Sequence, residues 1–82
     1  MAGTVIRSFA APGVASQSLT WDGRDLWLPD ASTSLIYQID PGTGTAIRSF
    51  ATPGAASVGL TFDGRTLWLV DVTAATIYQI NL

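Results

Sequence analysis

The same pattern occurs twice along the chain, as SLTWDGRDLWLPD at residues 18–30 and as GLTFDGRTLWLVD at residues 59–71. Extended outward, the match aligns residues 3–41 with residues 44–82 at a constant offset of 41, and 24 of the 39 aligned positions are identical. A repeat of about 20–50 residues indicates one supersecondary unit that must stack on its neighbours, because a single unit cannot bury its apolar face alone. The chain therefore contains two units, which we place at residues 1–43 and 44–82.

Each unit carries four strand signals, which are short apolar and β-branched runs bounded by Pro, Gly or Asp about ten residues apart. The Asp-Gly pairs at residues 22–23 and 63–64 predict hairpins, for which the favoured type I′ turn needs positive φ at both central positions. No helical period is present, so the expected fold is all-β. The expected strands are Thr4–Phe9, Ser18–Trp21, Asp25–Leu28 and Leu35–Ile39, and then Thr45–Phe50, Gly59–Phe62, Thr66–Val70 and Thr76–Ile80.

Four short strands in about 40 residues are typical of one blade of a β-propeller. The third strand of each unit is continuously apolar and does not alternate, a pattern that indicates burial on both faces. In a propeller each blade is covered by two neighbours, which meets that condition. We therefore predict two four-stranded blades per chain, with a blade-packing core formed by Leu26, Trp27, Leu28, Leu67, Trp68 and Leu69.

The two quoted stretches, each followed by IYQI at residues 36–39 and 77–80, resemble the repeats of bacterial propellers of the NHL-type and streptogramin-lyase-like group. The resemblance covers the full length and is specific for the blade, not for an activity. It implies that the first strand of each unit is the outermost strand of one blade, and that the next three strands begin the following blade. The chain then resembles two blades cut out of phase, and the close identity of its halves favours a fragment or a designed repeat.

Because the two blades are cut out of phase, the first strand of the chain has no blade of its own. The last strand of the chain has no outer strand beside it, so its edge is open. Because an open edge invites pairing with another chain, we expect residues 4–9 of one chain to pair with residues 76–80 of the next. The residues expected in this assembly strand and its partner are Thr4, Val5, Ile6 and Phe9 on one side and Ile77, Tyr78 and Ile80 on the other.

A head-to-tail contact of this kind closes into a ring when its rotation divides the circle. Two blades per chain give an even blade count, so the expected homo-oligomers are a trimer of six blades or a tetramer of eight. Ser18 and Gly59 begin the innermost strands and are small, which favours the tighter trimer. The partner of this chain is therefore expected to be itself.

The composition excludes several function classes. Six acidic and four basic residues give a net charge of -2, so the chain has no basic surface for nucleic acid. No apolar run approaches the ~20 residues of a membrane helix. Cys, His, Lys and Glu are all absent, which leaves no thiolate or imidazole ligand and no base to activate a Ser or Thr hydroxyl. Streptogramin-lyase-like enzymes use a histidine that this chain lacks. We therefore expect neither a cofactor nor an enzyme activity.

A ligand- or carbohydrate-binding propeller remains the alternative function. Asp30 and Asp71 follow the third strand of each unit, where a ring of carboxylates could bind a cation or sugar hydroxyls, or where each could bond the backbone of its own turn, as Asp commonly does. Trp21 precedes a turn and could stack on a sugar, although aromatic residues in such strands usually belong to the core. The loops that would line such a site are residues 10–17, 30–34, 51–58 and 71–75.

Overall fold

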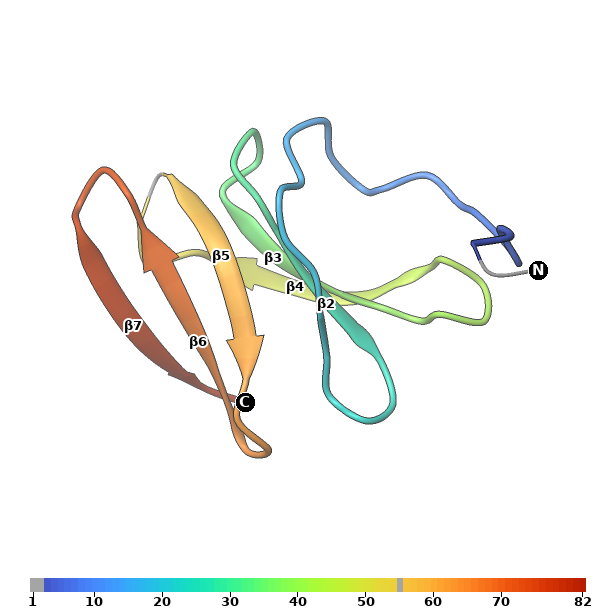
Figure 1. Cartoon of the computed structure of the whole chain (residues 1–82). Coiled ribbons are helices and arrows are strands. Elements are labelled where there is room, and N and C mark those ends of the chain that lie inside the picture. The colour runs from blue at the N-terminus through green and yellow to red at the C-terminus, as the bar shows by residue number, and fades with distance from the viewer. Residues whose placement is uncertain (1–2, 55) are drawn as a thin grey trace.

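The computed structural model describes residues 3–54 and 56–82, and these residues form an all-β protein with two antiparallel sheets (Figure 1). The first sheet has the order β1-β2-β3-β4 and the second has the order β5-β6-β7. The predicted all-β class is thus confirmed. The strands are β1 (Thr20–Trp21), β2 (Leu26–Asp30), β3 (Leu35–Ile39), β4 (Ala46–Ala51), β5 (Ser57–Phe62), β6 (Thr66–Asp71) and β7 (Thr76–Asn81).

Seven of the eight expected strands are present, with ends shifted by one or two residues. The exception is the segment of residues 4–9, which has no regular structure in the single chain. Its counterpart in the second unit is β4, and β4 pairs with β3 in the first sheet. The edge that such a strand would need is therefore already occupied within the first sheet, which explains why residues 4–9 form no strand there.

The two Asp-Gly hairpins form, but their turns are not of type I′, and that part of the prediction is wrong. Gly23 has a φ of 99° and Gly64 a φ of 103°, whereas Asp22 is not in the positive region. The turn is closed by the Asp22 amide donating to the carbonyl of Asp25 at 3.1 Å. Oδ1 of Asp22 also accepts the amide of Arg24 at 2.8 Å. The aspartate side chain thus supports a longer turn in which only glycine needs positive φ.

The core lies between the two sheets. Because residues paired across antiparallel strands share a face, the strand registers divide each sheet into two faces. In the first sheet, the Trp27 face comprises Trp27, Pro29, Ile36 and Phe50, and the Leu28 face comprises Leu26, Leu28 and Ile39, with Leu19 beside them. In the second sheet, the Leu60 face comprises Leu60, Phe62, Leu67, Leu69, Tyr78 and Ile80, and the Trp68 face comprises Trp68, Val70 and Ile77.

The Trp27 face packs on the Leu60 face. Trp27 and Ile36 are completely buried there, in one cluster with Leu60, Leu67 and Leu69. β5 lies against β1 and β2, and the amide of Leu60 donates to Oγ of Ser18 at 3.1 Å. Fully burying a large apolar side chain is worth about 1.5–3 kcal/mol, so this interface stabilises the arrangement of the two sheets.

The other two faces lie at opposite ends of this stack. The Leu28 face is covered by residues 7–12, so that Trp27 and Leu28, adjacent in β2, are both buried, as the apolar run predicted. Among residues 3–54 and 56–82, none of the other strands packs on the Trp68 face. Trp68 is half-buried, and Val70 and Ile77 are exposed. The expectation that this strand is buried on both faces therefore does not hold for β6 in a single chain.

Candidate functional site

The candidate site is the open edge of β7. β3, its counterpart in the first sheet, pairs with β2 on one side and with β4 on the other. β7 pairs with β6, and among the described residues no strand lies on its other side. This edge therefore presents backbone donors and acceptors that a further strand can bind.

The pairing of β4 with β3 shows what a fourth strand contributes. Nε of Arg48 donates to Oε1 of Gln38 at 2.8 Å, and its guanidinium lies 5.1 Å from the ring centroid of Trp27. The ring of Phe50 lies 6.1 Å from the same indole at an interplanar angle of 51°. Cation–π and tilted aromatic contacts of this kind each contribute roughly 0.5–1.5 kcal/mol. β4 therefore adds side-chain contacts to its ladder of backbone hydrogen bonds.

Each partner in this arrangement has an identical counterpart beside the open edge or in the N-terminal segment. At the offset of 41, Gln38 corresponds to Gln79 and Trp27 to Trp68, while Arg48 and Phe50 correspond to Arg7 and Phe9. Gln79 donates through Nε2 to Oγ1 of Thr66 at 3.1 Å, as Gln38 donates through Nε2 to Oδ2 of Asp25 at 2.7 Å.

The predicted assembly residues lie in two groups at opposite ends of the chain. Those of the N-terminal segment are exposed: Ile6 is 92% exposed and Val5 76%, Thr4 is exposed as well, and Phe9 is 42% exposed. On β7, Ile77 belongs to the Trp68 face and is 69% exposed. Tyr78 and Ile80 point the other way and pack against the core between the sheets. Within a single chain the two groups do not meet, because the N-terminal segment lies against the first sheet and β7 belongs to the second sheet.

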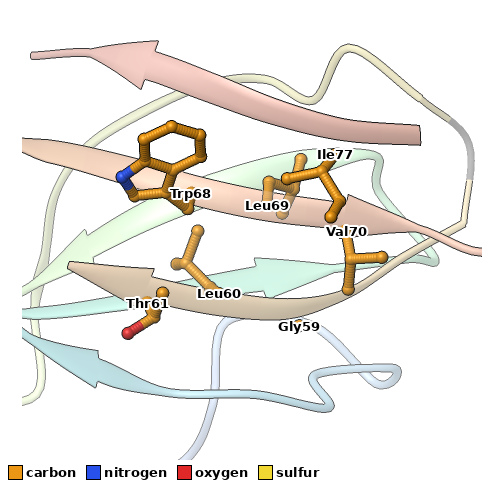
Figure 2. A pocket seen from close by; sticks show the side chains of 7 residues that line it. All are labelled: Gly59, Leu60, Thr61, Trp68, Leu69, Val70 and Ile77. Carbon is orange, nitrogen blue, oxygen red and sulfur yellow. The ribbon is translucent and has the colours of Figure 1, made fainter. Parts of the chain in front are cut away.

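The Trp68 face forms a shallow apolar hollow of about 220 Å³ along β5, β6 and β7. Figure 2 shows the side chains that line it, with Trp68 and Val70 on β6 and Ile77 on β7. Gly59 on β5 contributes no side chain, and a Cβ there would lie 2.9 Å from Cγ1 of Val70. The hollow is thus shaped by the absence of a side chain as well as by the large residues around it.

The N-terminal segment lies over the Leu28 face, on the side of the first sheet away from the second sheet (Figure 1). Nη1 of Arg7 donates to the carbonyl oxygens of Pro41 at 3.2 Å and Gly42 at 3.3 Å. The side chain of Phe9 lies against Gly44, where an added Cβ would be 2.5 Å from Cγ of the ring. These contacts hold the segment beside the turn that joins β3 to β4.

Asp30 is fully buried, and both of its carboxylate oxygens accept hydrogen bonds from its own chain. Oδ2 accepts the amide of Ala15 at 3.2 Å and the hydroxyl of Ser16 at 2.9 Å, and Oδ1 accepts the amides of Ser32 at 2.8 Å and Thr33 at 3.1 Å. These bonds, that of the Ser32 hydroxyl above all, lower the pKa of Asp30 to about 2. The carboxylate thus joins the loop before β1 to the turn after β2.

Asp71 repeats this arrangement in the second unit. It is fully buried, and it accepts the amide of Ala74 at 2.7 Å and the amide of Ala56 at 2.9 Å, which lower its pKa. Both carboxylates considered as ligands are therefore directed into the protein and accept hydrogen bonds from backbone amides. This is the second of the two roles considered for them, a bond to the backbone of the turn.

Sequence reasoning missed the partners of these carboxylates. Gly13 and Gly54 were interpreted only as parts of Pro-Gly turns, yet a Cβ on Gly13 would overlap the carboxylate of Asp30, and one on Gly54 that of Asp71. Each glycine precedes its aspartate by 17 residues in both units, and that constant spacing is the signal that could have linked them. The glycines are needed for close approach, since neither has positive φ.

Trp21 lies at the end of β1, paired with Leu26, and is 52% exposed. By its register it shares the side of the sheet that carries the Leu28 face. Its counterpart Phe62 packs against the core between the sheets. The difference follows from position, because Phe62 lies on the face of the second sheet that the first sheet covers, whereas no sheet of the described residues covers Trp21.

The residues that the structure describes contain no group of three or more His, Cys, Asp or Glu side chains that could hold a metal ion. They also contain no helix long and apolar enough to cross a membrane. No protein-family model matches this chain, and no curated protein matches it significantly. The interpretation of its function therefore rests on its own geometry.

Proposed function

We propose that this protein is a structural module that assembles with copies of itself, head to tail, into a closed ring of β-propeller blades without a catalytic role. One observation carries the proposal. The first sheet has four strands and the second has three, while residues 4–10 repeat residues 45–51, which include β4, except that Val5 stands where the later segment has Ala46. The chain thus has one strand too few in one sheet and one strand-forming segment without a sheet.

Pairing between chains resolves both. If residues 5–10 of one chain add to β7 of another in the register of β4 on β3, Phe9 lies opposite Ile77, Ser8 opposite Tyr78 and Arg7 opposite Gln79. Arg7 can then bond Gln79 and stack on Trp68, as Arg48 does with Gln38 and Trp27. This is strand addition, in which the backbone ladder supplies affinity and the side chains supply register.

The size of the ring depends on how closely neighbouring sheets approach near its centre. Ser18 lies next to the backbone of Leu60, since its hydroxyl accepts the Leu60 amide at 3.1 Å, and a larger side chain there would separate β1 from β5. A close approach at this end supports a steep wedge between sheets. We therefore propose a trimer with six blades, with a tetramer of eight blades as the next choice.

Native mass spectrometry of the full chain tests the proposal. Chains of 8.6 kDa give a mass of about 26 kDa for a closed trimer and about 34 kDa for a tetramer. We expect one dominant closed species at low micromolar concentration, and we expect removal of residues 1–9 to abolish it. A single-chain mass at all concentrations, with β-sheet circular dichroism retained, would contradict self-assembly.

A further inference from the structure

We propose that the Leu28 face is the docking face for the Trp68 face of a second copy, and that residues 7–12 cover it in the single chain until that copy displaces them. The inference rests on the proposed self-assembly and specifies the surfaces that it uses. It also assigns the N-terminal segment two alternative positions, one on its own chain and one on its neighbour.

The interface inside the chain is the template for this contact. There, the Trp27 face of the first unit packs on the Leu60 face of the second unit. At the offset of 41, Trp27 and Ile36 become Trp68 and Ile77, so the Trp27 face corresponds to the Trp68 face. The Leu60 face corresponds in the same way to the Leu28 face, and the matching residues are Leu60 with Leu19, Leu67 with Leu26, Leu69 with Leu28, and Ile80 with Ile39.

The two ends of the stack are therefore the two halves of an interface that the chain already forms once. The Trp68 face is open, with Ile77 69% exposed and a hollow of about 220 Å³ beside it. Placed on the Leu28 face of another copy, it repeats the pairing of Trp27 and Ile36 with three leucines. Because the two faces differ, the contact is head to tail. After each chain is added, the assembly again has a Trp68 face at one end and a Leu28 face at the other.

In the single chain, however, the Leu28 face is mostly covered, since Leu28 is 8% and Ile39 3% exposed, although Leu19 at its margin is 57% exposed. Residues 7–12 lie across it and leave a cavity of about 300 Å³ against Leu19, Leu26, Leu28 and Ile39. This hollow is partly open to solvent, so the cover leaves part of the apolar face unfilled. Sheet packing on the Leu60 face, by contrast, buries Leu67 and Leu69 completely.

The cover is fixed at one end and weakly held at the other. Residues 13–16 are anchored on Asp30, through the close approach of Gly13 and the bonds from Ala15 and Ser16. Within residues 7–11, Arg7 donates two hydrogen bonds to exposed carbonyl groups and Phe9 packs on Gly44. Rotation about residues 12–13 would release the segment without disturbing the anchor.

The neighbour that takes the docking face also takes the released segment. Inside the chain, β4 precedes the three strands of the second sheet and belongs to the sheet that packs on their Leu60 face. By the same connection, residues 4–10 precede β1, β2 and β3 and would join the sheet of the neighbouring copy that packs on their Leu28 face. One copy therefore supplies both the Trp68 face that replaces the cover and the β7 edge that receives the strand.

A reversible lock tests this inference in the full chain. A Cβ built on Gly44 lies 2.8 Å from Cβ of Phe9, about 1 Å inside the usual span of a disulfide, so Phe9→Cys with Gly44→Cys can be bridged after a small shift. We expect the oxidised double variant to remain at single-chain mass and the same sample, once reduced, to assemble. An oxidised variant that reaches the mass of the wild-type oligomer would overturn the inference and leave the proposed function intact.

A second pair of variants tests the same inference without cysteines, in case the cysteine substitutions themselves impair assembly. Gly44→Ala places a methyl group against Phe9, whereas Gly23→Ala, also at positive φ in a turn of the first sheet, meets nothing within 4 Å. Both substitutions carry similar backbone strain, but only the first disturbs the cover. We expect Gly44→Ala to assemble at a several-fold lower concentration than Gly23→Ala, because the Leu28 face is covered in a smaller fraction of the molecules. Equal concentrations would overturn the inference, while wild-type chains that never assemble would refute the proposed function instead.

Discussion

The indole nitrogen of Trp27 donates a hydrogen bond of 2.7 Å to Oδ2 of Asp22, across the turn between β1 and β2. Trp68 makes the same bond of 2.7 Å to Oδ2 of Asp63 in the second unit. The aspartate of the Asp-Gly-Arg turn therefore serves two purposes, since its other oxygen accepts backbone amides of the turn. A buried indole N–H needs such a partner, and the turn supplies it from five residues away.

Replacement of Asp22 by Ala should lower the free energy of unfolding by about 1–3 kcal/mol, because it leaves the N–H of a fully buried Trp27 without an acceptor. The equivalent change at Asp63 should cost less, since Trp68 is only half-buried and water can take over. Urea denaturation of both variants, at one concentration below that at which the chains assemble, measures the difference. If both variants lost the same free energy of unfolding, the hydrogen bonds from the aspartate to the turn amides, which both sites share, would contribute more than the bond to the indole.

Truncation of the two tryptophans should separate folding from assembly. Trp27→Ala should destabilise the single chain by about 3–5 kcal/mol, as large aromatic residues in a core do. Trp68→Ala should have a smaller effect on the dilute single chain but should raise the concentration needed for the oligomer, because in the proposed ring another copy covers its face. Thermal melts across a concentration series record both effects, and a Trp68→Ala variant that assembles like wild type would exclude its face from the interface.

The proposed strand register can be trapped by a disulfide between chains. In the register of β4 on β3, Arg7 lies opposite Gln79, so Arg7→Cys with Gln79→Cys should form a cross-link between chains that non-reducing electrophoresis detects. Ser8→Cys with Gln79→Cys is the control, because adjacent strand residues point to opposite faces. Cross-linking of the control pair alone would place the strand one residue out of the proposed register.

The buried carboxylates predict a dependence of stability on pH. The folded pKa of Asp30 is about 2, and that of Asp71 is also lowered, while an unfolded Asp titrates near 3.9. The unfolded chain therefore binds protons first as the pH falls, so stability should be constant above about pH 5 and should decline from about pH 4 toward pH 2. Circular dichroism melts over this range test it. The Asp30→Asn variant should be less stable at neutral pH and should show a shallower decline.

Two turns carry a non-glycine residue in the left-handed region, Ser34 with φ of 57° and Ala75 with φ of 52°. This conformation costs an L-residue roughly 1–2 kcal/mol, whereas glycine adopts it freely. Ala75→Gly should therefore stabilise the chain by up to about 1 kcal/mol, after the added freedom of the unfolded glycine is subtracted. The neighbouring Ala74→Gly, at negative φ, should destabilise it. Chemical denaturation measures the free energy of unfolding of both variants. If both were less stable than the wild type, Ala75 would not be strained by its positive φ.

The residues that the sequence placed correctly are those whose environment is local. Alternating and continuous apolar runs and the turn residues between them predicted β3 to the residue and most other strands to within one or two positions. Trp27, Leu67 and Leu69 were expected in the packing core and are buried between the sheets. Strand ends and apolar burial depend on side-chain chemistry over a few residues, which a single sequence displays.

The other features depend on residues that are distant in the chain. Residues 4–9 have the sequence of a strand, but a strand also needs a free edge beside it, and β4 already occupies the one in the first sheet. For Asp30 the sequence favoured a bond to its own turn over a ligand site, but its burial beside Gly13 and its bonds to the loop before β1 appear only in the structure. Trp27 and Trp68 occupy equivalent positions within the same Leu-Trp-Leu run, yet only Trp27 is covered by a second sheet, because the chain has two sheets and they share a single interface. The repeat by itself determined the strands and their order, whereas only the tertiary structure decided which edge and which faces were left open, since pairing and burial require a partner that local sequence does not contain.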